Sequence, residues 1–243
     1  MISKQQIKFI NSLHHSKYRL RHNCFIAEGM HVVNDFIQSD FIIKSVFSTI
    51  EYDQIINANS IVVSKSELAK ISVLKNPSSV LAVIHKPKWT YDLNKLINTN
   101  RIIILDSISD PGNMGTIIRT ADWYGIKDIY ISNNCVDVFS PKVVQSTMGS
   151  LCRVRLYSVD LSIIFKDLKR LSVPCYGATL SGKSVYAIKK PPVCALVFGS
   201  ESHGIMPTYL DYLDEQITIP TKNSFIDSLN VSVSFGIILS EFR

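Results

Sequence analysis

Short apolar, β-branched runs alternate with stretches of helical periodicity along the first third of the chain. Apolar residues at Ile7, Ile10 and Leu13 have the spacing of an amphipathic helix. Further apolar patterns predict four strands, at residues 24–28, 42–48, 61–65 and 80–85, and two helices, at residues 29–38 and 66–71. This alternation is typical of a small α/β domain.

The polar stretch KPKWTYDLNKLINTN, residues 86–100, interrupts the strand pattern and carries Pro87. We therefore place a domain linker within it and expect two domains, residues 1–90 and 91–243. The second domain repeats the alternation. Its predicted strands are residues 102–105, 128–132, 153–158, 173–179 and 216–220 and a strand from Cys194, and its predicted helices are residues 142–151, 161–171 and 228–242. The expected fold class of the whole chain is α/β.

The stretch LDSISDPGNMGTIIRTADWYG, residues 105–125, has the most pronounced pattern. It follows the apolar run Ile102 to Leu105, so Asp106 falls at the carboxyl end of a buried strand, where ligands gather in α/β proteins. The turn residues 110–113 precede a helix expected to begin near Met114, which places Arg119 on its second turn. An ordinary strand–turn–helix unit with a solvated arginine explains this stretch alone equally well.

Composition narrows the function classes. The 243 residues include 26 Lys and Arg against 20 Asp and Glu, a net charge of +6 that mildly favours a polyanionic partner. The five cysteines form no CxxC pair, so they are expected to be buried thiols in a reducing cytosol. The sequence contains no HExxH motif, so this pattern of metal ligands is absent. The N-terminal residues lack an apolar h-region and no run could span a bilayer, so we expect a soluble, cytoplasmic protein.

The densest positive charge lies before residue 27, where no acidic residue occurs. Tyr18 and Phe25 are interleaved with these basic residues, as in surfaces that bind a phosphate backbone and offer a ring to a base. The predicted RNA contacts in this segment are Lys17, Tyr18, Arg19 and Arg21. A solvated basic helix and loop is an equally good interpretation.

The sequence GATLSGKS, residues 177–184, matches the phosphate-loop pattern G-x-x-x-x-G-K-[ST] and follows a predicted strand. A phosphate loop requires a helix directly after it, because the amides of that helix hold the phosphates. Only VYAIKK stands before Pro191 and Pro192, and two of these six residues are β-branched. A nucleoside triphosphatase is therefore a minor alternative.

Three stretches together resemble the motifs of the SpoU family of RNA ribose 2′-O-methyltransferases, within the SPOUT class. They are DPGNMGTIIRTADWYG, then LVFGSESHGI, then ITIP followed by DSLNVSVSFGIILSE. The segment KYRLRHNCFIAEGMHVV resembles the ribosomal-protein-like substrate-binding domain of that family. The resemblance covers nearly the whole chain. It implies a C-terminal domain with a trefoil knot, S-adenosylmethionine as cofactor, a homodimer and no metal.

The resemblance also implies the residues of the site. Catalytic roles fall on Asn113, Arg119, Glu201, Ser228 and Asn230. Cofactor contacts fall on Thr179, Gly199, Ser200, Ile219, Pro220, Ser228 and Leu229. Because a guanidinium is always protonated, we expect Arg119 to bind RNA phosphate and developing alkoxide charge rather than to act as a base.

Two departures from the family pattern concern cofactor binding. Ser200 stands where the family often has Asn, and the loop TKNSFID, residues 221–227, lacks glycine and looks one residue longer than usual. The expected function is methylation of a ribose 2′-hydroxyl in RNA, with ribosomal RNA favoured because shorter tRNA-modifying relatives often lack the accessory domain. A tRNA ribose methyltransferase and a non-catalytic RNA-binding protein remain as alternatives.

Overall fold

The computed structural model describes residues 2–49, 60–97, 99–222, 225 and 227–243. The chain folds into two compact units. Unit 1 consists of Met1–Lys88 and Asp137–Arg153, and unit 2 consists of Trp89–Val136 and Val154–Arg243. Unit 1 is therefore built from two separate parts of the sequence.

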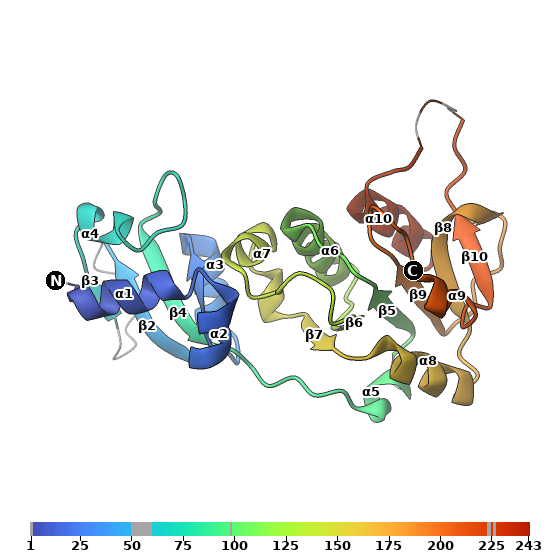
Figure 1. Cartoon of the computed structure of the whole chain (residues 1–243), viewed down its shortest axis with the longest axis horizontal. Helices are drawn as coiled ribbons and strands as arrows, with labels where there is room; N and C mark the ends of the chain where they lie inside the picture. Colours follow the sequence, from blue (N-terminus) through green and yellow to red (C-terminus); the bar gives the residue numbers. More distant parts are fainter. Residues whose placement is uncertain (1, 50–59, 98, 223–224, 226) are drawn as a thin grey trace. The chain divides into compact units, whose positions relative to one another are not determined.

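The sheet of unit 1 has the strand order β1-β4-β2-β3 (Figure 1). Its strands are β1 (Cys24–Glu28), β2 (Ile43–Ser48), β3 (Ser60–Val62) and β4 (Val80–His85). Strand β4 is antiparallel to both β1 and β2, whereas β2 and β3 are parallel. All five residues of β1 are buried, so both faces of this strand must be covered by other elements.

Helices cover the two faces of that sheet. Four of them come from the N-terminal part: α1 (Lys4–Ser12), α2 (Ser16–His22), α3 (Met30–Ile37) and α4 (Lys65–Ala69). Cys24 and Ile26 share one core with Ile10 and Leu13. Because side chains alternate along a strand, Phe25 points to the other face, where its ring lies 5.4 Å from Phe36 of α3 and 4.9 Å from Phe139.

Phe139 belongs to the second part of unit 1, residues 137–153. This segment contains α7 (Pro141–Ser146) and a short 3₁₀ turn, Ser150–Cys152. Helix α7 packs on β1, as α3 does. The segment thus completes the core of unit 1.

Unit 2 is built on a six-stranded sheet with the order β10-β8-β9-β5-β6-β7. Its strands are β5 (Arg101–Leu105), β6 (Asp128–Ile131), β7 (Arg155–Ser158), β8 (Cys175–Ser184), β9 (Cys194–Phe198) and β10 (Glu215–Thr218). Every neighbouring pair is parallel. Parallel sheets are covered on both faces, which explains the uninterrupted apolar runs of β5 and β9.

The helices of unit 2 are α5 (Leu93–Ile97), α6 (Pro111–Trp123), α8 (Leu161–Arg170), α9 (Pro207–Leu210) and α10 (Val231–Glu241). Ile102 and Ile104 of β5 share a core with α8. On the opposite face Phe198 of β9 contacts Phe235 of α10, at a ring distance of 5.0 Å. Helices α6 and α10 pack side by side there (Figure 1).

The predicted α/β class is confirmed, but several element boundaries differ from the prediction. The strand predicted at residues 173–179 extends to Ser184 as β8. Helix α6 begins at Pro111, not near Met114, because the Asp110 carboxylate caps it and Pro fits the first turn. The helix predicted at residues 142–151 ends at Ser146, and Gly149 with a φ of 92° interrupts it. The strand predicted to reach Pro220 ends at Thr218. Whether the chain threads a trefoil knot stays a prediction.

None of the helices in the described part of the chain is long and apolar enough to cross a membrane.

Candidate functional site

The first motif is held at the carboxyl end of β5 by helix capping. The Asp110 side chain accepts a hydrogen bond from the backbone N–H of Asn113 at 2.8 Å, which fixes the first turn of α6. Asn113 therefore sits on a rigid helix start. Its side-chain amide points away from the cap and bonds to the two other motifs.

The second motif forms a tight loop after β9. The backbone of Ser200 and that of Gly204 exchange two hydrogen bonds, at 3.0 and 2.9 Å. A Cβ atom on Gly199 would lie 2.0 Å from the backbone carbon of Gly204, so only glycine fits there. This closure presents Glu201 from the tip of the loop, and Asn113 Nδ2 donates to Glu201 Oε1 at 2.5 Å.

The third motif enters through the N-terminus of α10. Asn230 caps this helix, because its Oδ1 accepts from the backbone N–H of Ser232 at 2.9 Å. Its Nδ2 donates to Asn113 Oδ1, also at 2.9 Å. The three motifs therefore meet in one hydrogen-bond network, Asn230 to Asn113 to Glu201, which we call the motif network.

Asp106 has a structural part in this arrangement. It is fully buried at the end of β5. Its Oδ2 accepts from the backbone N–H of Met206, and its Oδ1 accepts from the Ser107 hydroxyl, both at 2.9 Å. The carboxylate thus joins β5 to the chain that follows the Glu201 loop. Each of its two oxygens accepts a hydrogen bond from inside the protein.

The remaining predicted site residues of unit 2 lie outside the motif network. Ile219 and Pro220 follow β10, and Ser228 and Leu229 directly precede the Asn230 cap. Arg119 is exposed on α6, six residues after Asn113, which is roughly 9 Å along the helix axis. The loop 221–227 lies partly outside the described residues.

Residues 177–184 do not form a phosphate loop. They belong to β8, and a turn rather than a helix follows Ser184. Lys183 forms an ion pair with Glu215 at 2.5 Å. A Cβ on Gly182 would lie 2.4 Å from the carbonyl oxygen of Gln216, so this glycine is required by strand packing. The Thr179 hydroxyl donates to the Ser181 carbonyl oxygen at 2.7 Å.

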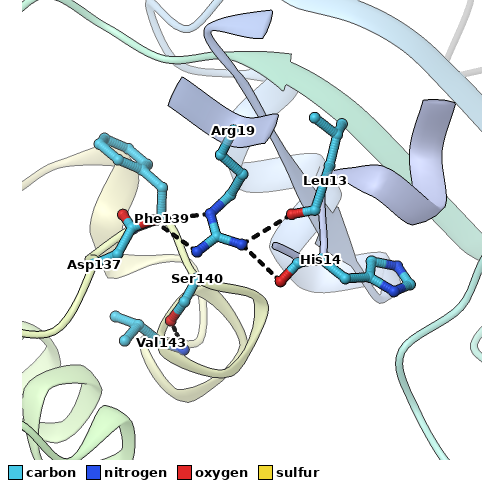
Figure 2. A network of polar contacts seen from close by, with 7 residues as sticks. All are labelled: Leu13, His14, Arg19, Asp137, Phe139, Ser140 and Val143. Atoms are coloured by element: carbon cyan, nitrogen blue, oxygen red, sulfur yellow. Dashed lines mark hydrogen bonds and ion pairs between the residues drawn. The ribbon is translucent and has the colours of Figure 1, made fainter. Parts of the chain in front are cut away.

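The predicted RNA contacts lie on α2 in unit 1. Lys17 and Arg21 are exposed, and Tyr18 is half-buried with its ring stacked on His22. The prediction for Arg19 was wrong, because its side chain is only 3% exposed and is paired with Asp137 (Figure 2). Four hydrogen bonds inside unit 1 hold this buried guanidinium, so it does not face solvent as an RNA contact would. The sequence held no signal for Asp137 as its partner.

Thiol chemistry is absent from this site. Burial raises the pKa of the Cys175 thiol to about 12 and that of the Cys194 thiol to about 11. Both thiols therefore stay protonated and unreactive at neutral pH. Within the described residues no group of three or more His, Cys, Asp and Glu side chains could hold a metal ion.

Two family models match the chain. Residues 100–240 match the SpoU rRNA Methylase family, and residues 4–82 match the MRM3-like substrate binding domain. A relative along nearly the whole length is the 23S rRNA (guanosine(2553)-2′-O)-methyltransferase RlmP of Bacillus subtilis. It is 28% identical over 244 residues, which cover 98% of this chain and 96% of RlmP.

Solved structures share the fold. A TrmH family protein from Porphyromonas gingivalis is 33% identical with a TM-score of 0.86, over 100% of this chain and 98% of that chain. An AdoMet-bound rRNA methyltransferase from Sinorhizobium meliloti is 25% identical with a TM-score of 0.88, over 100% of this chain and 96% of that chain.

The motif network generates a pH-dependent prediction. In Asn113→Asp a carboxylate replaces the amide that donates to Glu201, so two carboxylates face each other and the pKa of one rises. The variant should be as stable as Asn113→Ala at low pH and lose stability as the pH rises through that raised pKa. Differential scanning fluorimetry should show Asn113→Asp melting about 2 °C below Asn113→Ala at roughly pH 8, and level with it near roughly pH 4.5. Equal melting temperatures at both pH values would contradict the contact.

Proposed function

The chain belongs to the SpoU rRNA Methylase family, and on that basis we propose that it methylates a ribose 2′-hydroxyl of ribosomal RNA. The observation that carries the proposal is the motif network. It joins Asn113, Glu201 and Asn230, one residue from each of the three motifs, by hydrogen bonds of 2.5 and 2.9 Å. All five residues to which the resemblance assigns catalysis are present, which favours an enzyme over a non-catalytic RNA-binding protein.

We propose S-adenosylmethionine as the cofactor, and the residues present fit it. The Sinorhizobium meliloti relative is an AdoMet-bound structure. In this chain Leu229, 47% exposed beside Asn230, and the half-buried Ile219 offer apolar surface of the kind that an adenine ring occupies. Pro220 and Ser228 lie between β10 and α10, as Ile219 and Leu229 do, and Gly199 and Ser200 lie on the loop after β9; these four residues complete the proposed contacts. Thr179 is the weakest member, because its hydroxyl already bonds within its own strand.

The bound cofactor supplies an electrophilic methyl group on a sulfonium. The chain must hold the ribose oxygen in line with that group and stabilise the negative charge that develops on the oxygen. Arg119 is suited to this role, because its guanidinium is exposed and can bind a phosphate through two parallel N–H groups. Asn113 and Glu201 are bonded to each other, so we assign them to holding the loops in place.

Ribosomal RNA is the proposed substrate. The B. subtilis relative is named as a 23S rRNA enzyme, and it matches 98% of this chain. Residues 4–82 match a substrate-binding domain, and α2 in this region exposes Lys17 and Arg21. A tRNA substrate stays the second candidate. All five cysteines are free, which supports the reducing cytoplasm as the location.

We further propose a homodimer. Helix α10 carries apolar residues around most of its circumference, as helices buried on all sides do. In the single chain, however, Val233 of α10 is 50% exposed, and Trp123 at the end of the adjacent helix α6 is 85% exposed. A second copy that covers these helices would bury them.

The activity itself is tested first. The purified protein, incubated with labelled S-adenosylmethionine and a 23S rRNA transcript that contains guanosine 2553, should transfer methyl to RNA. Nuclease digestion and mass spectrometry should place that methyl on a ribose. A tRNA pool serves as the competing substrate. Failure to bind S-adenosylmethionine in calorimetry, or transfer to a base instead of a ribose, would contradict the proposal.

Arg119→Ala should leave cofactor affinity within a few-fold but cut single-turnover methyl transfer by about 100-fold, as expected for one lost electrostatic donor. Arg119→Lys should restore little, because lysine keeps the charge but lacks the planar fork. Arg170→Ala, which removes an exposed arginine from α8, is the matched control and should behave as wild type. Loss of cofactor binding in Arg119→Ala would place this residue in a different role.

Sedimentation tests the dimer. The wild-type protein should sediment at twice the chain mass of 27.3 kDa, and Val233→Glu should sediment as a monomer. Ile163 of α8 is a matched control because it is 48% exposed against 50% for Val233. Ile163→Glu should remain dimeric. A monomeric wild-type protein would overturn the proposed assembly.

A further inference from the structure

The Arg19 side chain makes four hydrogen bonds within unit 1. Its Nε and Nη2 donate to Asp137 Oδ2 at 2.9 and 2.7 Å. Its Nη1 donates to the carbonyl oxygens of Leu13 and His14, both at 2.9 Å (Figure 2). One guanidinium therefore joins the chain between α1 and α2 to the start of the segment 137–153.

This segment has an unusual place in the sequence. It packs with unit 1, yet it is preceded by β6 and followed by β7, which are neighbouring strands of the sheet of unit 2. The hydrogen bonds between Arg19 of α2 and Asp137 thus attach the basic helix to the segment 137–153, whose two ends continue into β6 and β7 of the sheet of unit 2.

The segment is seated on unit 1 at both ends. Near its start the Phe139 ring packs on Phe25 and lies under the Lys86 ammonium, at 5.0 Å. Near its end Gly149 has a φ of 92°, and a Cβ there would lie 2.1 Å from Asp35 Oδ2, so the backbone passes directly over α3. Arg153 then pairs with Asp35 at 3.1 Å. These contacts fix one position of the segment.

A buried ion pair is weak evidence for stability, because the cost of removing two charges from water offsets their attraction. In some proteins such a pair instead imposes one specific geometry, and we apply that explanation to this pair. The exposures of 3% for Arg19 and 25% for Asp137 fit this explanation. The neighbours of Arg19 on α2, Lys17 and Arg21, are exposed and lie four residues apart, so they share one face of the helix.

We propose that Arg19 and Asp137 are positioning residues for the RNA substrate: their ion pair sets the orientation of α2, and through α2 that of Lys17 and Arg21. The proposal rests on the proposed function, in which unit 1 binds RNA. Neither Arg19 nor Asp137 touches the RNA. The pair acts by coupling the RNA-binding helix to the segment that runs into β6 and β7.

The sign of the effect of Asp137→Asn tests this proposal. Removal of an acidic residue from a basic protein should strengthen RNA binding if only net charge matters. Loss of the ion pair between Arg19 and Asp137 should weaken RNA binding instead. Asp40→Asn is the matched control, because Asp40 is exposed, lies in the same unit and takes no part in that ion pair.

The probe is the 23S rRNA transcript that contains guanosine 2553, labelled for fluorescence anisotropy and used with the full-length protein. Asp137→Asn should raise the Kd for the transcript and its KM by about tenfold, the scale of a misplaced contact. The kcat at saturating RNA and the affinity for S-adenosylhomocysteine should stay unchanged. Asp40→Asn should bind the transcript at least as tightly as wild type, and Asp137→Glu should recover most of the lost affinity.

Arg19→Lys gives the same test if Asp137→Asn does not fold, because it keeps the charge and loses the fork. The double variant Arg19→Lys with Asp137→Asn should be no weaker for RNA than the worse single variant. Asp137→Asn or Arg19→Lys proteins that bind the transcript as tightly as wild type would overturn the positioning role. Wild-type protein that binds the transcript without methylating it would overturn the proposed function alone, because the anisotropy comparison does not depend on turnover.

Discussion

The side-chain amide of Asn113 holds the site of unit 2 together. It accepts from Asn230, 117 residues away, and donates to Glu201, 88 residues away. An amide can do both at once, because it carries a donor and an acceptor. Its position depends on the Asp110 cap of α6, and that of Glu201 depends on a loop in which Gly199 touches the backbone of Gly204. Asn113 and Glu201 are thus placed by a helix cap and by the backbone geometry of a closed loop.

Much of unit 2 could be predicted because its strands are buried on both faces. Apolar runs such as Ile102 to Leu105 indicate buried parallel strands, and glycine, proline and asparagine mark the turns between them. The start of α6 was missed because Pro111 was assigned to a turn, although proline also suits a first helical turn. The residues 177–184 that match the phosphate-loop pattern belong to strand β8. In the sequence, only the lack of a helix after them indicated that they form no phosphate loop.

In unit 1, the burial of individual charged side chains and the packing of residues 137–153 could not be predicted from the sequence. The basic segment was predicted as one surface, but Arg19 points inward while Lys17 and Arg21 point out. Charge density along a sequence does not say which side chains are buried, since a partner such as Asp137 can lie 118 residues away. The same limit applies to residues 137–153. Their apolar pattern predicted a helix, but no pattern could show that the helix packs on β1, a strand in the N-terminal part of the chain.

The contribution of residues 137–153 to unit 1 has a physical consequence for substrate binding. A domain joined by one linker can bind RNA without any effect on the catalytic sheet. Unit 1 instead uses residues 137–153 to cover Phe25, so its core is incomplete without chain that the sheet of unit 2 holds on either side. The Arg19 and Asp137 pair adds direction to that apolar contact, because two N–H groups of one guanidinium donate to the same carboxylate oxygen, and hydrogen bonds weaken steeply when their geometry changes. The basic helix is therefore held, within unit 1, by chain that continues into strands β6 and β7 of the sheet of unit 2.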